Sequence, residues 1–220
     1  MSDIKPEIAS IYMYPDGNEI VFVATDSFRL AEKKVKVKDL PEFDGVLVPI
    51  KNIQDIIKVF SSDKGSVDVV IGDNQISFTT EDIYLTSQLI DGVYPDYRQI
   101  LPQEFNTEIT TLSGDLLQAV RMTNIFADRF NQVDLVINPE EKKVTLASHN
   151  ADVGENTTQI DAVIEGESIA TSINHRYLSD VFQSITTDSI KVGFVAENKP
   201  MILEGVGDGS FLYLIMPMNR

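Results

Sequence analysis

Few side chains in this sequence could carry out catalysis, because the chain contains two histidines and no cysteine. His149 lies in the string SHNADVGEN, where an imidazole beside amide and carboxylate groups could transfer a proton or bind a metal ion. His175 is the other imidazole, and the many carboxylates fall mostly in turns or on solvated faces. Single histidines in loops are more often structural or surface groups. We therefore predict no catalytic residue and expect that the chain is not an enzyme.

Two other segments resemble ligand-binding loops but lack the required pattern. The stretch EGVGDGS (204–210) is rich in glycine, yet the strand-like run FLYLIM follows it, so no helix N-terminus is available to hold a phosphate. Asp16, Asn18 and Asp208 could make a casual Ca²⁺ site, but neither loop has the spacing of a dedicated one. We expect hairpin turns here, with no metal site and no cofactor.

The elements that carry these residues are mostly short strands. Runs with alternating or β-branched residues are separated by turn-forming residues, as in Pro15-Asp16-Gly17-Asn18. Short connections predict mostly antiparallel sheets. The predicted strands cover 19–24, 45–50, 66–72, 75–80, 83–90, 133–138, 143–148, 157–164, 190–196, 200–204 and 211–216.

Three segments, 51–61, 113–127 and 174–185, have a helical period instead. Ser113 and Asn174 are the predicted N-caps of the second and third helices. Each helix has one apolar side, so it must lie against a sheet and present its other face outward. The outward faces carry a modest excess of basic residues, which either line a binding surface or are ordinary solvated faces: Lys51, Lys58, Arg121 and Arg176.

The chain contains an internal repeat. The apolar and acidic positions of KNIQDIIKVF recur in HRYLSDVFQSI, and an alternating run follows each copy. Two copies of a unit of this size predict two similar domains. The helix at 113–127 has no counterpart in the first copy, because that counterpart would lie before Met1. We therefore expect the first copy to be truncated.

Composition predicts a cytoplasmic protein. The 220 residues are 43% apolar, and no run approaches the ~20 apolar residues that cross a bilayer. The first residues have neither the basic region nor the apolar run of a secretory signal, and no membrane partner is expected. The net charge of −16 predicts high solubility and, taken alone, argues against binding to nucleic acid.

Three separated motifs resemble the bacterial sliding clamp family, the beta subunit of DNA polymerase III: VATDSFRLA (23–31), LIDGVYPDYRQILP (89–102) and LIMPMNR (214–220). The resemblance implies an α+β fold of duplicated clamp domains, with antiparallel sheets on the outside and helices lining one concave face. It further implies that residues 1–104 form a middle clamp domain without its opening strand and helix. Residues 105–220 would form a complete C-terminal clamp domain.

The resemblance also implies a function as a processivity factor. In the family, a homodimeric ring encircles double-stranded DNA, slides on it without reading bases, and tethers replication and repair proteins. The implied partners are duplex DNA, the DNA polymerase III alpha subunit, the clamp loader and other proteins with clamp-binding motifs. Lys51, Lys58, Arg121 and Arg176 are the candidate DNA-facing residues. Without a first domain, this chain is not expected to close a ring by itself.

A partner-peptide groove is the second implied site. Two Met residues flanking a Pro would give a polarizable surface that repacks around different ligands. Burial of two apolar peptide side chains, offset by ordering, predicts affinities of about micromolar. The residues carried over from the family are Ile8, Thr25, Phe28, Arg29, Leu30, Pro95, Ile100, Pro200, Leu214, Met216, Pro217 and Met218.

Several positions depart from the family pattern. Phe28 stands where His or Tyr is usual, Gln99 where a basic residue is common, and Asn219 where Arg is frequent. These changes predict a more apolar and less positive rim. Ser27 replaces a frequent Gly, which raises the question of backbone strain. The alternative is an acidic, β-rich scaffold or adhesin-type binding protein with no role on DNA, which would leave the basic helix faces unexplained.

Overall fold

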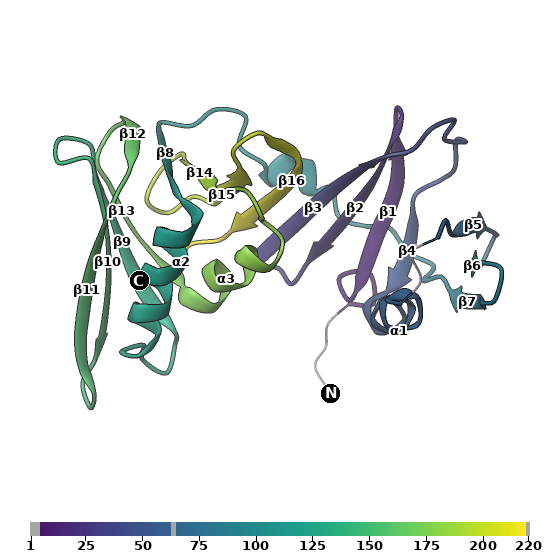
Figure 1. Ribbon diagram of the computed structural model, residues 1–220, viewed down its shortest axis with the longest axis horizontal. Helices are drawn as coiled ribbons and strands as arrows, with labels where there is room; N and C mark the ends of the chain where they lie inside the picture. The colour runs from purple at the N-terminus through teal and green to yellow at the C-terminus, as the bar shows by residue number, and fades with distance from the viewer. Residues whose placement is uncertain (1–4, 63–64, 219–220) are drawn as a thin grey trace. The chain divides into compact units, whose positions relative to one another are not determined.

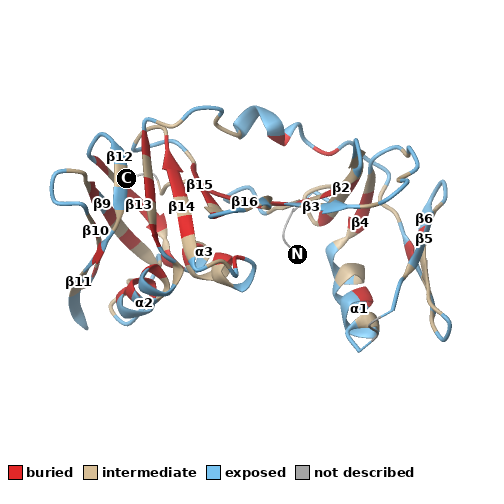
Figure 2. Cartoon of the chain, turned by 45° about the horizontal axis from the view of Figure 1, so that its top comes forward, coloured by how far each residue is buried: buried red, intermediate tan, exposed pale blue. Residues whose placement is uncertain are grey.

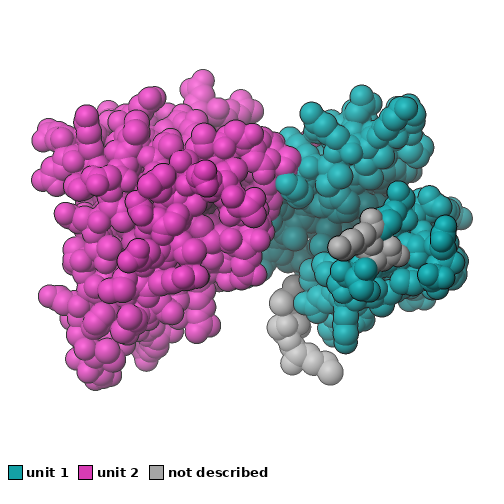
Figure 3. Space-filling view, viewed as in Figure 1, with its two compact units in different colours: residues 1–96 teal, residues 97–220 magenta. Residues whose placement is uncertain are grey.

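The computed structural model describes residues 5–62 and 65–218 (Figure 1). The chain divides into two compact units, Met1–Asp96 and Tyr97–Arg220, which Figure 3 shows in different colours. The sequence predicted a domain boundary after residue 104, which falls inside unit 2, shortly after the observed division. Across the described ranges, no helix is long and apolar enough to cross a membrane.

Unit 1 is built from two antiparallel sheets and a helix. One sheet has the order β3-β2-β1-β4, and the other has the order β5-β6-β7. The elements are β1 (Ser10–Asp16), β2 (Glu19–Thr25), β3 (Arg29–Lys36), β4 (Val46–Pro49), α1 (Ile50–Phe60), β5 (Asp68–Ile71), β6 (Gln75–Thr79) and β7 (Tyr84–Gln88).

Unit 2 has the same plan with additional elements. Its sheets have the orders β11-β10-β9-β13 and β12-β8-β14-β15-β16, again antiparallel. The elements are η1 (Tyr97–Ile100), β8 (Thr107–Leu112), α2 (Ser113–Asn124), β9 (Gln132–Asn138), β10 (Lys143–Asn150), β11 (Gly154–Asp161), β12 (Val163–Gly166), β13 (Ile169–Asn174), α3 (His175–Asp180), η2 (Val181–Gln183), β14 (Ser189–Phe194), β15 (Met201–Gly205) and β16 (Asp208–Ile215).

The two units repeat one topology. The order β3-β2-β1-β4 matches β11-β10-β9-β13, a helix follows the last strand of each group, and three strands in sequence then form the second sheet. In unit 2, β8 pairs with the edge of β14, and α2 packs against α3, β10 and β11. Among the described residues of unit 1, no strand pairs with the free edge of β5, and no helix corresponds to α2.

This difference leaves the core of unit 1 open. In unit 2, Leu178 is almost completely buried, whereas its counterpart Ile53 on α1 is partly exposed. Ile57 on α1 is 63% exposed, whereas its counterpart Phe182 is partly buried. The interior of unit 1 contains an apolar hollow of about 620 Å³, whose lining includes Met13, Ile53 and Phe78. In Figure 2, β14 is mostly buried while β5 and β6 are mostly intermediate or exposed. The predicted amphipathic face of α1 therefore exists but is incompletely covered.

One of the two predicted helix caps is present. The Asn174 side chain accepts the backbone N–H of Arg176 at 2.9 Å, as the sequence predicted. The prediction for Ser113 is wrong, because Ser113 is the first residue of α2 and its hydroxyl donates to the Thr187 carbonyl at 2.7 Å. That bond ties the start of α2 to the segment before β14 and leaves the helix without a side-chain cap.

Candidate partner-binding surface and basic helix faces

Side chains of the turn between β2 and β3 fix its shape. The Thr25 hydroxyl donates to the Arg29 carbonyl at 2.7 Å and accepts the N–H of Ser27 at 3.1 Å. The Asp26 carboxylate accepts the backbone N–H groups of Phe28 and Arg29, each at 3.0 Å, and its second oxygen lies 2.9 Å from the Arg29 Nε. Local side-chain to backbone bonds of this kind hold a turn in one conformation.

Ser27 adopts the left-handed backbone conformation, with φ of 76°. This conformation costs a non-glycine residue about 1–2 kcal/mol, which explains why glycine suits the position. The question raised by the sequence is therefore answered: the backbone is strained there, and the surrounding hydrogen bonds hold it. The next residue, Phe28, has a side chain that is 60% exposed.

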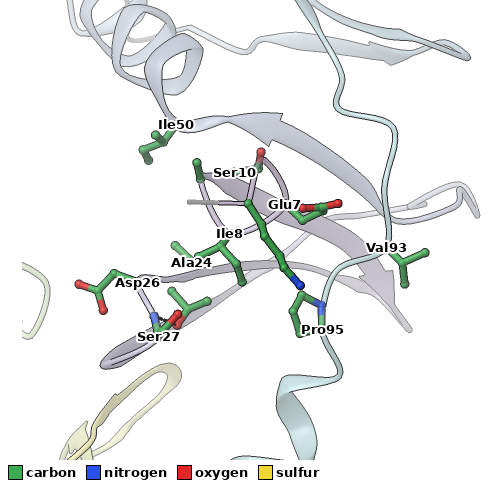
Figure 4. A pocket seen from close by; sticks show the side chains of 12 residues that line it. Glu7, Ile8, Ser10, Ala24, Asp26, Ser27, Ile50, Val93 and Pro95 are labelled. Atoms are coloured by element: carbon green, nitrogen blue, oxygen red, sulfur yellow. Dashed lines mark hydrogen bonds between the residues drawn. The ribbon is translucent and has the colours of Figure 1, made fainter. Parts of the chain in front are cut away.

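A hollow of about 770 Å³ lies beside this turn within unit 1. Figure 4 shows that its lining side chains come from the N-terminal segment, from β2 and its turn, from the start of α1, and from the chain just before Tyr97. The lining is largely apolar, with charged groups among it: Lys5, Glu7, Ile8, Ala9, Ser10, Ala24, Thr25, Asp26, Ser27, Ile50, Val93 and Pro95.

Aromatic stacking positions one wall of this hollow. The Tyr94 ring stacks on the Tyr12 ring with centroids 4.9 Å apart. This stacking holds Tyr94 in place, and with it the neighbouring residues Val93 and Pro95, which line the hollow. Burial raises the pKa of the Tyr94 phenol to about 12, so this ring is neutral throughout the physiological pH range. The wall should therefore be insensitive to pH.

The structure brings three of the predicted groove residues of unit 1 to this hollow, namely Ile8, Thr25 and Pro95. Phe28 and Arg29 follow in the adjoining turn, and Arg29 pairs with Asp26. Leu30 is only 1% exposed, so it supports the strand and offers no surface to a ligand in this conformation.

The predicted groove residues of unit 2 lie on three segments. Leu214 is buried in β16, whereas Met216, Pro217 and Met218 follow that strand and are partly exposed. The Met218 N–H donates to the Ser172 carbonyl at 2.8 Å, so the segment is anchored at the backbone. The other two members are Ile100 at the end of η1, which is 46% exposed, and Pro200, which precedes β15. Asn219 lies outside the described residues.

The four predicted DNA-facing residues are exposed on helices. Lys51 and Lys58 lie on α1, Arg121 lies on α2 and Arg176 lies on α3. Each side chain is solvent-exposed, as the helical pattern predicted. Within unit 2, Arg121 and Arg176 line one hollow of about 280 Å³ between α2 and α3.

The two histidines differ in environment. The His149 side chain is 73% exposed, and its Nδ1 lies 3.9 Å from a Glu155 carboxylate oxygen. His175 is 4% exposed, and burial followed by the charge of Arg176 lowers its pKa. Sequence reasoning treated His175 as an isolated residue and did not place it beside Arg121. The spacing of Asn174, His175 and Arg176 at a helix start was the only local signal.

A metal site is absent from the part of the chain that the structure describes, where no three His, Asp or Glu side chains gather closely enough to hold an ion. The glycine-rich stretch 204–210 forms the turn between β15 and β16, as predicted, with Gly207 at φ of 83°. The Asp208 carboxylate accepts the Ser210 N–H at 2.9 Å, so it is occupied within its own turn.

Comparison with known proteins decides the family. Residues 98–219 match the DNA polymerase III beta subunit, C-terminal domain, and residues 1–96 match the central domain of the same subunit. The chain belongs to the DNA polymerase III beta subunit family. The resemblance found in the three sequence motifs is therefore confirmed.

Relatives and solved structures agree with this membership. A beta sliding clamp of Staphylococcus aureus (strain Mu50 / ATCC 700699) is 28% identical over 219 residues, which are 99% of this chain and 58% of that protein. The DNA polymerase sliding clamp of Bacillus subtilis has a TM-score of 0.94 at 29% identity, covering 100% of this chain and 59% of that one.

A more distant structure shows the same fold. The DNA polymerase III subunit beta of Pseudomonas aeruginosa has a TM-score of 0.93 at 23% identity, covering 100% of this chain and 60% of that one. The predicted α+β fold with mostly antiparallel sheets is thereby confirmed. The chain spans about three-fifths of the length of the relatives that it matches.

Proposed function

We propose that this chain is part of a DNA sliding clamp, a processivity factor without enzymatic activity. Its ring would encircle duplex DNA and tether DNA polymerase and other replication and repair proteins. The observation that carries the proposal is the match of both units, along nearly their full length, to two consecutive domains of the beta subunit family. An acidic scaffold or adhesin would share the strands and the charge, but this family membership disfavours it.

The partner-peptide groove is proposed for the surfaces that carry Ile8, Thr25 and Pro95 in unit 1 and Met216 to Met218 in unit 2. Three properties support it. The unit 1 hollow is large and mostly apolar, the turn beside it is held rigid by the Asp26 hydrogen bonds, and the Met218 backbone is anchored to Ser172. A rigid apolar surface lowers the ordering cost of binding a short peptide.

The DNA-facing surface is proposed for the exposed basic residues of the helices. Lys51, Lys58, Arg121 and Arg176 are all solvent-accessible in a chain of net charge −16. Weak, delocalised attraction to phosphates suits a ring that must slide, and an acidic remainder discourages other contacts with DNA. The implied partners are duplex DNA, the DNA polymerase III alpha subunit, the clamp loader and other clamp-binding-motif proteins, in the cytoplasm.

The domain assignment follows from the internal comparison. We propose that unit 1 is most of a middle clamp domain without its opening strand and helix, and that unit 2 is a C-terminal clamp domain. The strand β8 and the helix α2 of unit 2 are the elements that have no counterpart in the described part of unit 1.

Direct peptide binding tests the proposed function. A fluorescein-labelled peptide that carries Gln followed by Leu and Phe, as clamp-binding motifs do, is titrated with the 220-residue chain and followed by anisotropy. We expect a dissociation constant of about micromolar, because two buried apolar side chains contribute a few kcal/mol beyond the ordering cost. A peptide with both apolar residues replaced by Ser is the control. Equal binding of the two peptides, or none at millimolar protein, would reject the proposal.

A further inference from the structure

The hollow between α2 and α3 has the donors of an anion site. Its lining residues are Val120, Arg121, Asn124, His175, Arg176, Ser179 and Asp180. Two arginines, an asparagine and a serine line this space of about 280 Å³ together with Asp180, and the space is large enough for a tetrahedral oxyanion. Guanidinium groups are the side chains best matched to phosphate oxygens.

His175 supplies an independent reason to expect a ligand there. Its side chain lines the hollow but is only 4% exposed, and neither ring nitrogen has a hydrogen-bond partner in the described structure. Buried polar atoms are nearly always hydrogen-bonded, because an unpaired one loses its water without compensation. The N–H of an imidazole left in this state beside two arginines can donate to an acceptor that carries negative charge.

The charged groups around His175 favour an anion over a cation. Its helix contributes Arg176, Tyr177 and Asp180, and Asp180 already has an interaction of its own within the protein. The helix α2, which packs against α3, contributes Arg121 to the hollow. The other charged residue of α2, Asp115, lies about 9 Å from Arg121 along the helix axis, because each residue advances about 1.5 Å. The strand β13 and the helix η2, which also pack on α3, carry no charged side chain. Nearby, the Asp128 carboxylate accepts the backbone N–H groups of Phe130 and Gln132.

We propose that this hollow holds a single phosphate group of the duplex backbone, bound by Arg121 and Arg176, with His175 behind them as a proton-dependent third donor. The inference rests on the proposed function and deepens it. At this point of the surface, one preferred contact with a phosphate takes the place of uniform, delocalised attraction between basic side chains and the DNA backbone. A contact with one phosphate reads no sequence, so it is compatible with sliding.

The proposal makes phosphate binding depend on pH with a definite sign. In the free chain, burial and Arg176 lower the pKa of His175, so the imidazole is neutral at neutral pH. A bound phosphate adds negative charge beside the ring and raises that pKa, which means that binding takes up a proton. Affinity for the phosphate therefore increases as the pH falls from above the pKa of the bound state to below that of the free state.

The test follows the imidazole C2–H signals of both histidines by NMR as the pH is varied. The 220-residue chain is titrated alone, with inorganic phosphate, and with a short DNA duplex, at constant ionic strength set with NaCl. We expect the pKa of His175 to rise by about one pH unit in the presence of the duplex. His149 is exposed, lies on β10 and does not line the hollow, so its C2–H signal is the internal reference for any general effect of the anion.

Matched variants identify the contacts. The double variant Arg121→Gln plus Arg176→Gln should abolish the rise, whereas Arg129→Gln should retain it, because Arg129 lies over the Phe130 ring and outside the hollow. All three arginines are exposed, so the variants should fold. A rise with the duplex that depends on Arg121 and Arg176 supports the proposal.

Three outcomes would overturn it. The first is no change at His175, the second is a change that survives in the double variant, and the third is a response to inorganic phosphate but not to the duplex. The third outcome would identify a site for a free anion. If His175 does not respond but the clamp-binding peptide still binds, only this inference fails and the proposed function stands.

Discussion

Replacing both Met216 and Met218 by alanine is expected to weaken binding of the clamp-binding peptide by about 10- to 100-fold. Both side chains are partly exposed at the end of β16, where they are free to cover an apolar ligand residue. Losing about 0.7–1.4 kcal/mol of apolar burial at each of the two positions gives this factor. An anisotropy titration of the labelled peptide measures it directly.

The backbone at these positions should survive the change. The bond from the Met218 N–H to the Ser172 carbonyl involves no side chain, so the segment keeps its place in the variant. The matched control is Met122→Ala, because Met122 is 42% exposed on α2 and is not part of the proposed peptide groove in either unit. If Met122→Ala weakened peptide binding as much as the double variant does, the groove assignment would be wrong.

Replacing Gly166 by alanine is expected to lower the free energy of unfolding by about 3 kcal/mol or more. Gly166 has φ of 114°, a conformation that L side chains rarely adopt, and an added Cβ would overlap the Asn106 carbonyl and lie 2.8 Å from the Thr107 Cα. Those backbone atoms cannot move easily, because the Thr107 hydroxyl donates to the Glu167 carbonyl at 2.9 Å and accepts its N–H at 3.1 Å. Urea denaturation followed by circular dichroism measures the loss.

The same substitution elsewhere in unit 2 should have the opposite sign. Gly114 lies in the first turn of α2 with an ordinary backbone conformation, and a Cβ added there would meet no atom within 4 Å. Gly114→Ala should therefore raise the free energy of unfolding by about 0.5 kcal/mol, since alanine favours the helix. A similar small effect at both glycines would mean that the β8–β12 pairing is not as the structure has it.

Much of the secondary structure was predictable because the pattern is local. The helices α1 and α2 begin within one residue of the predicted starts, and the Asn174 cap lies where the sequence placed it. The repeat was also visible, because apolar and acidic positions recur at equal spacing in both copies. Ser113 could not be read correctly, since its partner Thr187 is 74 residues away in the sequence.

Strands whose alternation is broken by polar residues were missed. β3 carries Glu32, which is buried with its carboxylate 3.4 Å from the Lys34 Nζ, and a charged residue at a buried position hides the period of two. β8 and β13 are rich in Thr and Ser, and several of their hydroxyls bond to backbone carbonyls of distant segments. These partners are set by tertiary packing and leave no local signal.

Only those residues of the candidate sites that lie within recognisable motifs or helical patterns were predictable from the sequence. The turn 25–29 and the Met-Pro-Met segment were found from the resemblance, but the burial of Leu30 and Leu214 depends on strand packing that no motif records. The hollow between α2 and α3 is the clearest case. Arg121 and Arg176 were predicted from separate helical patterns, and only the fold brings them together with His175.

Methyl NMR of the methionines identifies the surface that the clamp-binding peptide covers. The chain has six methionines, and the described ones fall in distinct places: Met13 in the apolar hollow of unit 1, Met122 on α2, Met201 in the core of unit 2, and Met216 and Met218 at the proposed groove. On addition of the clamp-binding peptide, the Met216 and Met218 signals should shift while those of Met122 and Met201 stay in place. A shift of Met13 with Met216 and Met218 unmoved would show that the peptide occupies the open core of unit 1, and would contradict a groove at Met216 and Met218.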